Sequence, residues 1–323
     1  MFRRQQMEFA QFVILLFFAV TAITVAIFID VAIKWPNLIK KWTEVDKALS
    51  ASYGFPSDLH RRLKMIAFII LVAAIAEHTL YWAFRFKYIE RGETFSETVQ
   101  LYFEQQFDQV FSIVPYCVVV GVVAQIVNTF STLSWNFMDL FIIIVSLALS
   151  ARFKQVVVRI RALTKKKEEN VDVWCRVRED YTRLAILCEN VDDTISTIML
   201  VSFGNNIFVV LVQLYYSIER PPVNAALDKI YYVYSFSFLV IRTIAVALYA
   251  ATIHTESKKP QYYLNAISMH VYNVEIERFI YQVRYSIITL TGHKLFKVNT
   301  SLILRIAGAI VSYELVLIQF HVA

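Results

Sequence analysis

Long apolar blocks alternate with shorter polar stretches along the whole chain. Six of the blocks reach roughly 18 residues or more, which is the length that one helix needs to cross a bilayer. They occupy residues 9–33, 65–86, 128–151, 194–217, 230–253 and 299–321. Because a helix satisfies its own backbone hydrogen bonds in lipid, the pattern predicts an all-α, polytopic membrane protein with six spans.

The composition supports the same interpretation. Hydrophobic residues make up 58% of the 323 residues and charged residues only 18%, whereas soluble domains are about 45–50% apolar and about 25% charged. The blocks are also longer and more regularly spaced than the helices of most soluble cores. These features argue against a large soluble protein with buried helices.

The distribution of basic residues predicts the orientation of the spans. The net charge is +6, and a basic chain can indicate a nucleic-acid partner. Here, however, the basic residues alternate from loop to loop. The loops 34–64, 152–193 and 254–298 hold 7, 10 and 6 of the 32 Lys and Arg residues. Since basic loops stay cytoplasmic during insertion, these three loops are predicted inside, and both ends of the chain outside.

Arg3 and Arg4 disagree with this orientation locally, because they flank the first block and would hold its beginning inside. The block that follows them runs to about Ile33, too long for the apolar region of an ordinary signal peptide. We therefore expect the complete architecture to have one further span before the first block.

Two boundaries are less regular. Pro36 is predicted to end the first helix, with Trp35 at the membrane interface. Residues 93–127 are apolar enough for a seventh span, but such a span would break the charge alternation. Two alternatives stay open for this stretch: a helix packed over the outer surface, or one long helix that begins above the membrane and enters it near Asn128. Residues 152–193 and 255–298 predict amphipathic helices that extend below the bilayer.

Aromatic and hydrogen-bonding side chains gather in the outer halves of four spans. Carboxylates and imidazoles within a span are costly and usually face a polar cavity. Glu77, His78, Tyr81 and Trp82 follow the spacing of one helical face. The candidate ligand-binding residues are Glu77, His78, Tyr81, Trp82, Trp135, Asn136, Asp139, Tyr215, Tyr231 and Tyr234.

This mixture fits a polyhydroxylated ligand such as a small sugar. The C–H faces of a sugar ring lie against aromatic rings, and its hydroxyls form strong hydrogen bonds with carboxylates. Two alternatives stay open: an interfacial aromatic belt, and pairing of Glu77 or Asp139 with His78 or Arg242. The sequence contains no recognised catalytic motif and no metal-ligand spacing, so we expect neither an enzyme nor a cofactor or metal.

The last block ends in "SYELVLIQF", residues 312–320. On a helix, Ser312, Leu315, Val316 and Gln319 form one stripe. Four or more copies around an axis would make a hydrophobic constriction that opens by widening and wetting. A helix that faces lipid can carry the same stripe by chance, so the stripe alone does not decide between the two.

The same ending resembles the signature of the last helix of insect gustatory receptors, which is Thr-Tyr, five hydrophobic positions and Gln-Phe. Tyr313, Gln319 and Phe320 match this signature, and Ser312 stands in place of Thr. Glu314 departs from the hydrophobic run in the form used by the sugar-receptor branch. The loop "KWPNLIKKWTEVDKAL" is similar to that branch too.

The resemblance implies a seven-span, ligand-gated, non-selective cation channel, with the family's first span absent from this chain. It implies homo- or heterotetramers with other gustatory receptors in the plasma membrane of gustatory neuron dendrites. Small sugars would be the ligands and cations the permeant ions. Gln319 and Phe320 match residues that form the gate. The chain would then divide into sensing helices with cytoplasmic extensions (1–253), cytoplasmic anchor helices (254–298) and a pore-lining helix (299–323).

Two other membrane proteins are alternatives. A G-protein-coupled receptor would carry a DRY-like cytoplasmic triplet and an extracellular disulfide. A transporter would carry Gly-rich broken helices and internal repeats. The sequence contains none of these features.

Overall fold

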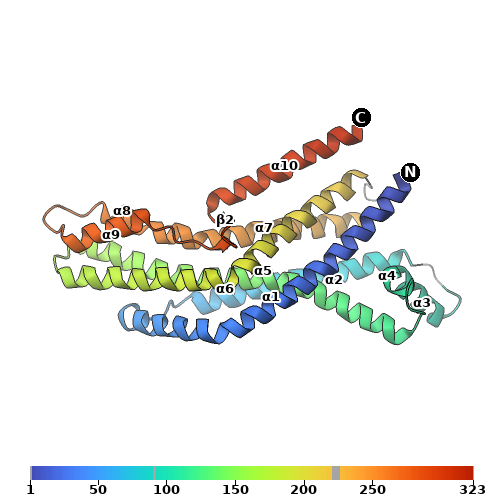
Figure 1. Cartoon of the computed structure of the whole chain (residues 1–323), viewed down its shortest axis with the longest axis horizontal. Helices are drawn as coiled ribbons and strands as arrows, with labels where there is room; N and C mark the ends of the chain where they lie inside the picture. Colours follow the sequence, from blue (N-terminus) through green and yellow to red (C-terminus); the bar gives the residue numbers. More distant parts are fainter. Residues whose placement is uncertain (1, 90–91, 220–225, 323) are drawn as a thin grey trace.

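The computed structural model describes residues 2–89, 92–219 and 226–322, and the side chains of 2–10, 218–219, 314, 317, 318 and 320–322 lie outside that description. The fold is almost entirely helical, as predicted (Figure 1). Its long helices are α1 (Phe2–Tyr53), α2 (Leu59–Lys87), α5 (Val118–Lys166), α6 (Val171–Glu219), α7 (Ala226–Lys258) and α10 (Thr300–Val322). The short elements are α3 (Phe95–Gln106), α4 (Asp108–Phe111), α8 (Pro260–Leu264), α9 (Val274–Tyr285) and an antiparallel pair, β1 (Thr291–Gly292) and β2 (Phe296–Lys297).

Within the described residues, five helices are long and apolar enough to cross a membrane, namely α1, α2, α5, α6 and α7. The sixth predicted span coincides with α10, a helix of 23 residues. Residues Thr300–Tyr313 of α10, whose side chains are all described, form an apolar helix. The six predicted blocks therefore correspond to six long helices.

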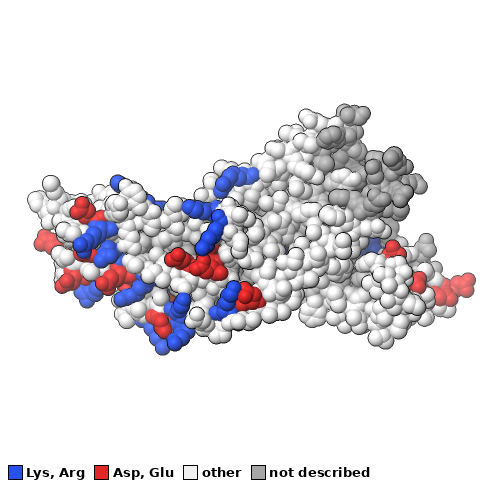
Figure 2. All heavy atoms as spheres, in the orientation of Figure 1, with Lys and Arg blue, Asp and Glu red and all other residues white. Residues whose placement is uncertain are grey.

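Charged side chains gather at one end of the molecule, over the inner parts of α5 and α6 and over α8 and α9 (Figure 2). A wide surface without Lys, Arg, Asp or Glu follows, and acidic side chains return at the opposite end. Figure 1 shows both termini at the end away from the basic side chains. This arrangement agrees with the predicted orientation, in which the basic loops share one side of the membrane.

The prediction that Pro36 ends the first helix was wrong, because α1 continues through Pro36 to Tyr53. Proline removes one backbone hydrogen bond and usually kinks or breaks a helix. Here Val31 precedes the proline, and Leu38 and Leu49 follow it, and all three are buried in the main core. Packing against α5 and α6 on both sides of the proline holds the helix together.

The stretch 93–127 forms two kinds of structure. From Val118 onward it belongs to α5, one continuous helix of 49 residues, so the long-helix alternative is confirmed there. Before it, α3 and α4 lie over the outer end of the bundle. α3 begins with a capping box, in which the Thr94 side chain accepts from the Glu97 amide and the Glu97 side chain accepts from the Thr94 amide.

The helices divide into a peripheral and a central set. In the most apolar window of α1 only 6% of the residues are buried, and in that of α2 11%, against 56% in α5 and in α6. α1 and α2 therefore present apolar side chains outward, as helices do in lipid. The core extends into the charged end, where Phe153, Tyr181 and Phe279 stack edge to face at 5.3–5.8 Å and Trp174 is fully buried.

Ion pairs tie the inner ends of the helices together. Arg152 of α5 is buried and lies 2.8 Å from Asp46 of α1. On α6, Arg178 lies 2.8 Å from Glu275 of α9. The hydrogen bond that Arg178 donates holds the pKa of the Glu275 carboxyl below its usual value. These contacts link α1 to α5 and α6 to α9 at the charged end.

Candidate ligand-binding site

A cavity of about 400 Å³ lies in the outer half of the bundle, within the range of about 300–1,000 Å³ that is usual for small-molecule sites. Side chains of α1, α2, α5, α6 and α7 line it, and α3 and α4 contribute Gln106 and Gln109. Six of the ten predicted ligand-binding residues line this cavity: Glu77, His78, Tyr81, Trp135, Asn136 and Tyr231. The structure thus brings together residues from three helices that are far apart in the sequence.

α2 supplies a stripe of three polar residues. Glu77, Tyr81 and Arg85 are four residues apart and all line the cavity. Gln106, at the end of α3, donates a hydrogen bond of 2.6 Å to the Tyr81 hydroxyl and accepts one from Arg85 Nε. Arg85 and Gln106 were not predicted. The four-residue spacing could have identified Arg85, whereas the position of Gln106 depends on how α3 folds back over the bundle.

Among the described residues, the Glu77 carboxylate accepts a hydrogen bond on one of its two oxygens only. Ser235 of α7 donates to Glu77 Oε1 over 2.9 Å, and Gln213 of α6 donates to Ser235 over 3.3 Å. These two hydrogen bonds link α6, α7 and α2 across the cavity. Glu77 Oε2 accepts no hydrogen bond from the side chains that the structure describes, so it is available to a ligand.

α5 supplies the largest aromatic ring of the site. Trp135 packs edge to face on Phe17 of α1, with ring centroids 5.1 Å apart. Within the described part of the chain, its buried Nε1 has no hydrogen-bond acceptor, and the buried Oε1 of Gln213 has no donor. Both residues line the cavity. A buried donor or acceptor without a partner is costly, and a ligand hydroxyl can satisfy both kinds of atom.

Asp139 lies one turn below Trp135, and it does not line the cavity. Its carboxylate is buried against Arg242 of α7, with Nε and Oδ2 2.8 Å apart. Ser202 donates to Oδ1 over 2.6 Å, and Asn206 donates to both oxygens. The structure therefore places Asp139 in the pairing with Arg242 that the sequence left open.

Arg242 connects this buried cluster to the cavity. One of its terminal nitrogens donates to Asn136 Oδ1, and both Arg242 and Asn136 line the cavity. The cluster of Asp139, Arg242, Ser202 and Asn206, called here the polar floor, thus positions cavity-lining groups from beneath.

The other three predicted residues lie outside the cavity lining. Trp82 is 42% exposed and packs its ring on His78, with centroids 5.1 Å apart. Tyr234 donates to the Ala73 carbonyl over 3.1 Å. Tyr215 contacts Tyr216 edge to face near the outer end of α6.

α10 presents two different faces. Ile306 packs against the main core, and Ile310 packs on a small cluster of Val210, Leu214 and Leu239 from α6 and α7. The predicted gate residues Ser312, Leu315, Val316 and Gln319 are exposed. The side chain of Phe320 lies outside the described residues. The stripe noted in the sequence is therefore on the side of α10 that faces away from its own bundle.

Comparison with known proteins identifies relatives along nearly the whole chain. The sequence profile of the family described as "Trehalose receptor" matches residues 2–323. Gustatory receptor for sugar taste 64f of Drosophila melanogaster is 33% identical over 91% of this chain and 62% of its own length. Gustatory receptor for sugar taste 64a is 34% identical over 96% and 69%, and Gustatory receptor 5a for trehalose is 32% identical over 91% and 66%. The chain thus spans about two thirds of the length of these relatives.

Solved structures give the fold. The insect olfactory receptor OR5 from Machilis hrabei in complex with eugenol superposes with a TM-score of 0.64 at 15% identity, over 94% of this chain and 79% of that one. A second structure of OR5 from Machilis hrabei gives a TM-score of 0.63 at 16% identity. This likeness concerns the fold alone, and the relatives are named as receptors rather than enzymes. The chain therefore belongs to the trehalose receptor family of insect gustatory receptors, and it adopts the helical membrane fold of the insect olfactory receptors.

Proposed function

We propose that the protein is a subunit of a sugar-gated, non-selective cation channel of the plasma membrane, with its sugar site in the outer cavity. The observation that carries this proposal is the unpartnered pair of cavity atoms, the donor Trp135 Nε1 and the acceptor Gln213 Oε1. A sugar hydroxyl both donates and accepts, so it matches such a pair. The relatives named for sugar taste and for trehalose support small sugars, including disaccharides, as the ligand class.

The cavity combines the two surfaces that a sugar needs. The rings of Trp135, Tyr81 and Tyr231 offer flat apolar faces to the C–H groups of a sugar ring. Glu77 Oε2 accepts from a hydroxyl, and Arg85 and Arg242 donate. Because sugar hydroxyls are already well solvated in water, we expect binding in the millimolar range, about −4 kcal/mol.

The packing of α10 suggests how binding reaches the gate. α7 lines the cavity with Tyr231 and Ser235, and one turn further along it Leu239 packs beside Ile310 of α10. A sugar that draws the outer ends of the cavity helices together would move this contact and pull α10 outward. The ligand can shift the gate only by its higher affinity for the open state.

The exposed face of α10 supports an assembly around a shared axis. In a homo- or heterotetramer, Leu315, Val316 and Gln319 of four copies would form a hydrophobic constriction closed by an amide ring, which opens by widening and wetting. Phe320 is proposed to take part in the gate on the basis of the signature match alone. The plasma membrane of gustatory neuron dendrites is the location that this function requires.

A matched pair of tryptophan variants tests the site. Trp135→Phe keeps an aromatic ring and removes the unpartnered N–H. The half-maximal sugar concentration should therefore rise about fivefold, because the loss of one hydrogen bond of about 1 kcal/mol weakens binding by that factor. Trp82→Phe changes an exposed ring outside the cavity and should leave the response unchanged. Calcium imaging against a sugar panel, normalised to surface-labelled protein, provides the readout. Equal shifts in the two variants, or none in Trp135→Phe, would contradict the assignment.

A further inference from the structure

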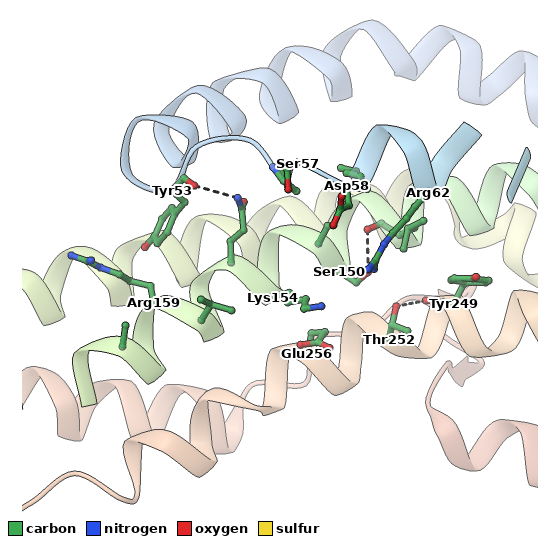
Figure 3. Close-up of a pocket in the computed structure, with 17 residues that line it drawn as sticks. Tyr53, Ser57, Asp58, Arg62, Ser150, Lys154, Arg159, Tyr249, Thr252 and Glu256 are labelled. Carbon is green, nitrogen blue, oxygen red and sulfur yellow. Dashed lines mark hydrogen bonds between the residues drawn. The ribbon is translucent and has the colours of Figure 1, made fainter. Parts of the chain in front are cut away.

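A second and larger cavity, of about 640 Å³, opens at the charged end of the bundle (Figure 3). The loop between α1 and α2 covers one side, and α5 and α7 form the others. All three helices change there from apolar to charged sequence: α2 begins at Leu59, α5 becomes basic after Ala151, and α7 becomes charged after Ile253. In the predicted orientation this level is the cytoplasmic surface of the membrane.

Three cations line this cavity without an ion pair or a side-chain hydrogen bond to the described residues. Arg62 of α2 and Lys154 and Arg159 of α5 all contribute to its wall, and Figure 3 shows them spread along the cavity, with Lys154 between Arg159 and Arg62. None of their side chains forms an ion pair or a hydrogen bond with the residues described here. The nearby Arg152, by contrast, is bonded to Asp46, Ser50 and the Gly54 carbonyl. The cavity therefore holds three cationic groups that no described carboxylate contacts directly, although Glu168 lies within electrostatic range of Arg159.

The acidic residues of the cavity do not cancel this charge. Asp58 and Glu256 also line the wall, and Glu256 Oε1 already pairs with Lys259 over 2.5 Å. Glu256 Oε2 is buried, and no described group donates to it. An occupant would thus meet three cations, the Asp58 carboxylate and the open Glu256 Oε2, which suits an anion that also carries hydroxyl or ammonium donors.

Apolar side chains form another part of the wall. Leu59, Leu147, Val158 and Tyr249 line the same cavity, so its surface is basic on one part and hydrophobic on another. A small inorganic anion would leave the hydrophobic part unused. A phospholipid matches both parts, with its head group among the cations and the start of its acyl chains against the apolar residues.

We infer that this cavity binds an anionic phospholipid of the inner leaflet. Basic pockets between spanning helices on the cytoplasmic side commonly receive such head groups, and Arg and Lys form charge-assisted hydrogen bonds with phosphate oxygens. Hydroxyl or ammonium groups of the head group donate to Glu256 Oε2. The bound lipid joins the inner ends of α2, α5 and α7, the same helices whose outer halves line the first cavity. This inference concerns lipid binding alone and does not depend on the sugar site.

The test measures lipid binding to the purified protein by native mass spectrometry. Dioctanoyl phosphatidylinositol bisphosphate is compared with dioctanoyl phosphatidylcholine and with free inositol trisphosphate. We expect the anionic lipid to bind about tenfold or more tightly than the neutral lipid, since one basic residue near a membrane surface contributes about fivefold. The combined variant Arg62→Gln, Lys154→Gln and Arg159→Gln should lose this preference.

A matched control removes the same charge elsewhere. Lys40→Gln, Arg161→Gln and Lys165→Gln change three exposed cations on α1 and α5 that lie outside the cavity, and this variant should keep the preference. An equal loss in both variants would mean that overall charge attracts the lipid, and would overturn the inference. So would the absence of any preference in the unchanged protein. Inositol trisphosphate that binds as tightly as the lipid would assign the cavity to a soluble phosphate instead.

A second measurement covers the case in which the cavity variant does not fold. A photoreactive anionic phospholipid is cross-linked to the unchanged protein in bilayer nanodiscs, and the labelled peptides are identified. Label on the α1–α2 loop or on the turn of α5 from Lys154 to Arg159 would support the inference. Label confined to other segments would overturn it.

Discussion

The outer cavity and the polar floor beneath it occupy neighbouring turns of the same helices, yet they differ in whether their polar side chains have hydrogen-bond partners. In the floor, both oxygens of Asp139 accept hydrogen bonds and Arg242 lies against them. In the cavity, Trp135 Nε1 and Gln213 Oε1 have no partner among the described residues. The floor is thus satisfied within the protein, whereas the cavity leaves polar atoms open, as the proposed sugar site requires.

Breaking the floor should have the largest effect. Asp139→Ala leaves the buried Arg242 guanidinium without its carboxylate, and removing one member of a buried ion pair costs about 3–5 kcal/mol of stability. We expect a large fall in the melting temperature and in the yield of folded protein, measured by fluorescence-detected size exclusion after heating. The double variant Asp139→Leu with Arg242→Met should be milder, because no buried charge remains. A double variant as damaging as the single one would contradict the pairing.

Changing the carboxylate of the cavity should separate binding from stability. Glu77→Gln keeps an oxygen for the Ser235 hydroxyl but removes the charge from the open Oε2 side. Hydrogen bonds to charged groups contribute about 1.5–3 kcal/mol, so sugar sensitivity should fall about 10- to 100-fold while the melting temperature hardly changes. Dose–response curves and thermal melts on the same variant check both halves. A loss of stability like that of Asp139→Ala, with normal sensitivity, would reverse the roles of the two carboxylates.

The gate should respond independently of both regions. Gln319→Ala removes the amide near the outer end of α10, so we expect a higher resting current without sugar. The ratio of closed to open channels should fall about fivefold, because the closed state loses one hydrogen bond of about 1 kcal/mol. Leu304→Ala, on an exposed position near the other end of α10, is the control and should leave the resting current unchanged. Recordings in which both variants match the unchanged protein would remove Gln319 from the gate.

The smallest effect concerns an ion pair outside the membrane. Arg178 holds the pKa of Glu275 below its ordinary value, so the pair adds stability above about pH 4.3, and that stability is lost as the pH falls through the lowered pKa. Hydrogen exchange of α9, corrected for intrinsic rates, should therefore accelerate on acidification. In Arg178→Gln this acid-dependent change should be smaller. An identical pH dependence in both proteins would show that another group controls α9.

The sequence predicted the helices of both regions but not the difference between them. Runs of apolar residues suffice for the spans, because the membrane imposes one length, and the alternating basic loops remain the basis of the predicted orientation. Glu77 and Asp139 are indistinguishable in sequence, since each is an acid near aromatic residues in the outer half of a span. Their roles separate only when Ser202 and Asn206 of α6 and Arg242 of α7 pack against one of them.

Long-range packing also explains the remaining differences. Gln106 reaches the cavity because α3 folds back across the outer end, and nothing local in the sequence specifies that return. Pro36 stays within α1 because buried side chains on both sides of it pack against the bundle, and this tertiary effect outweighs the local preference of proline. Arg85 could have been found from its spacing with Glu77 and Tyr81.

The most direct test of the sugar site is electron cryo-microscopy of the protein at saturating sugar, compared with the same protein without sugar. Ligand density in the outer cavity, against the Trp135 ring and within hydrogen-bond distance of Glu77 and Gln213, is the result we expect. Density for the sugar at any other position, with the outer cavity unchanged, would contradict the account.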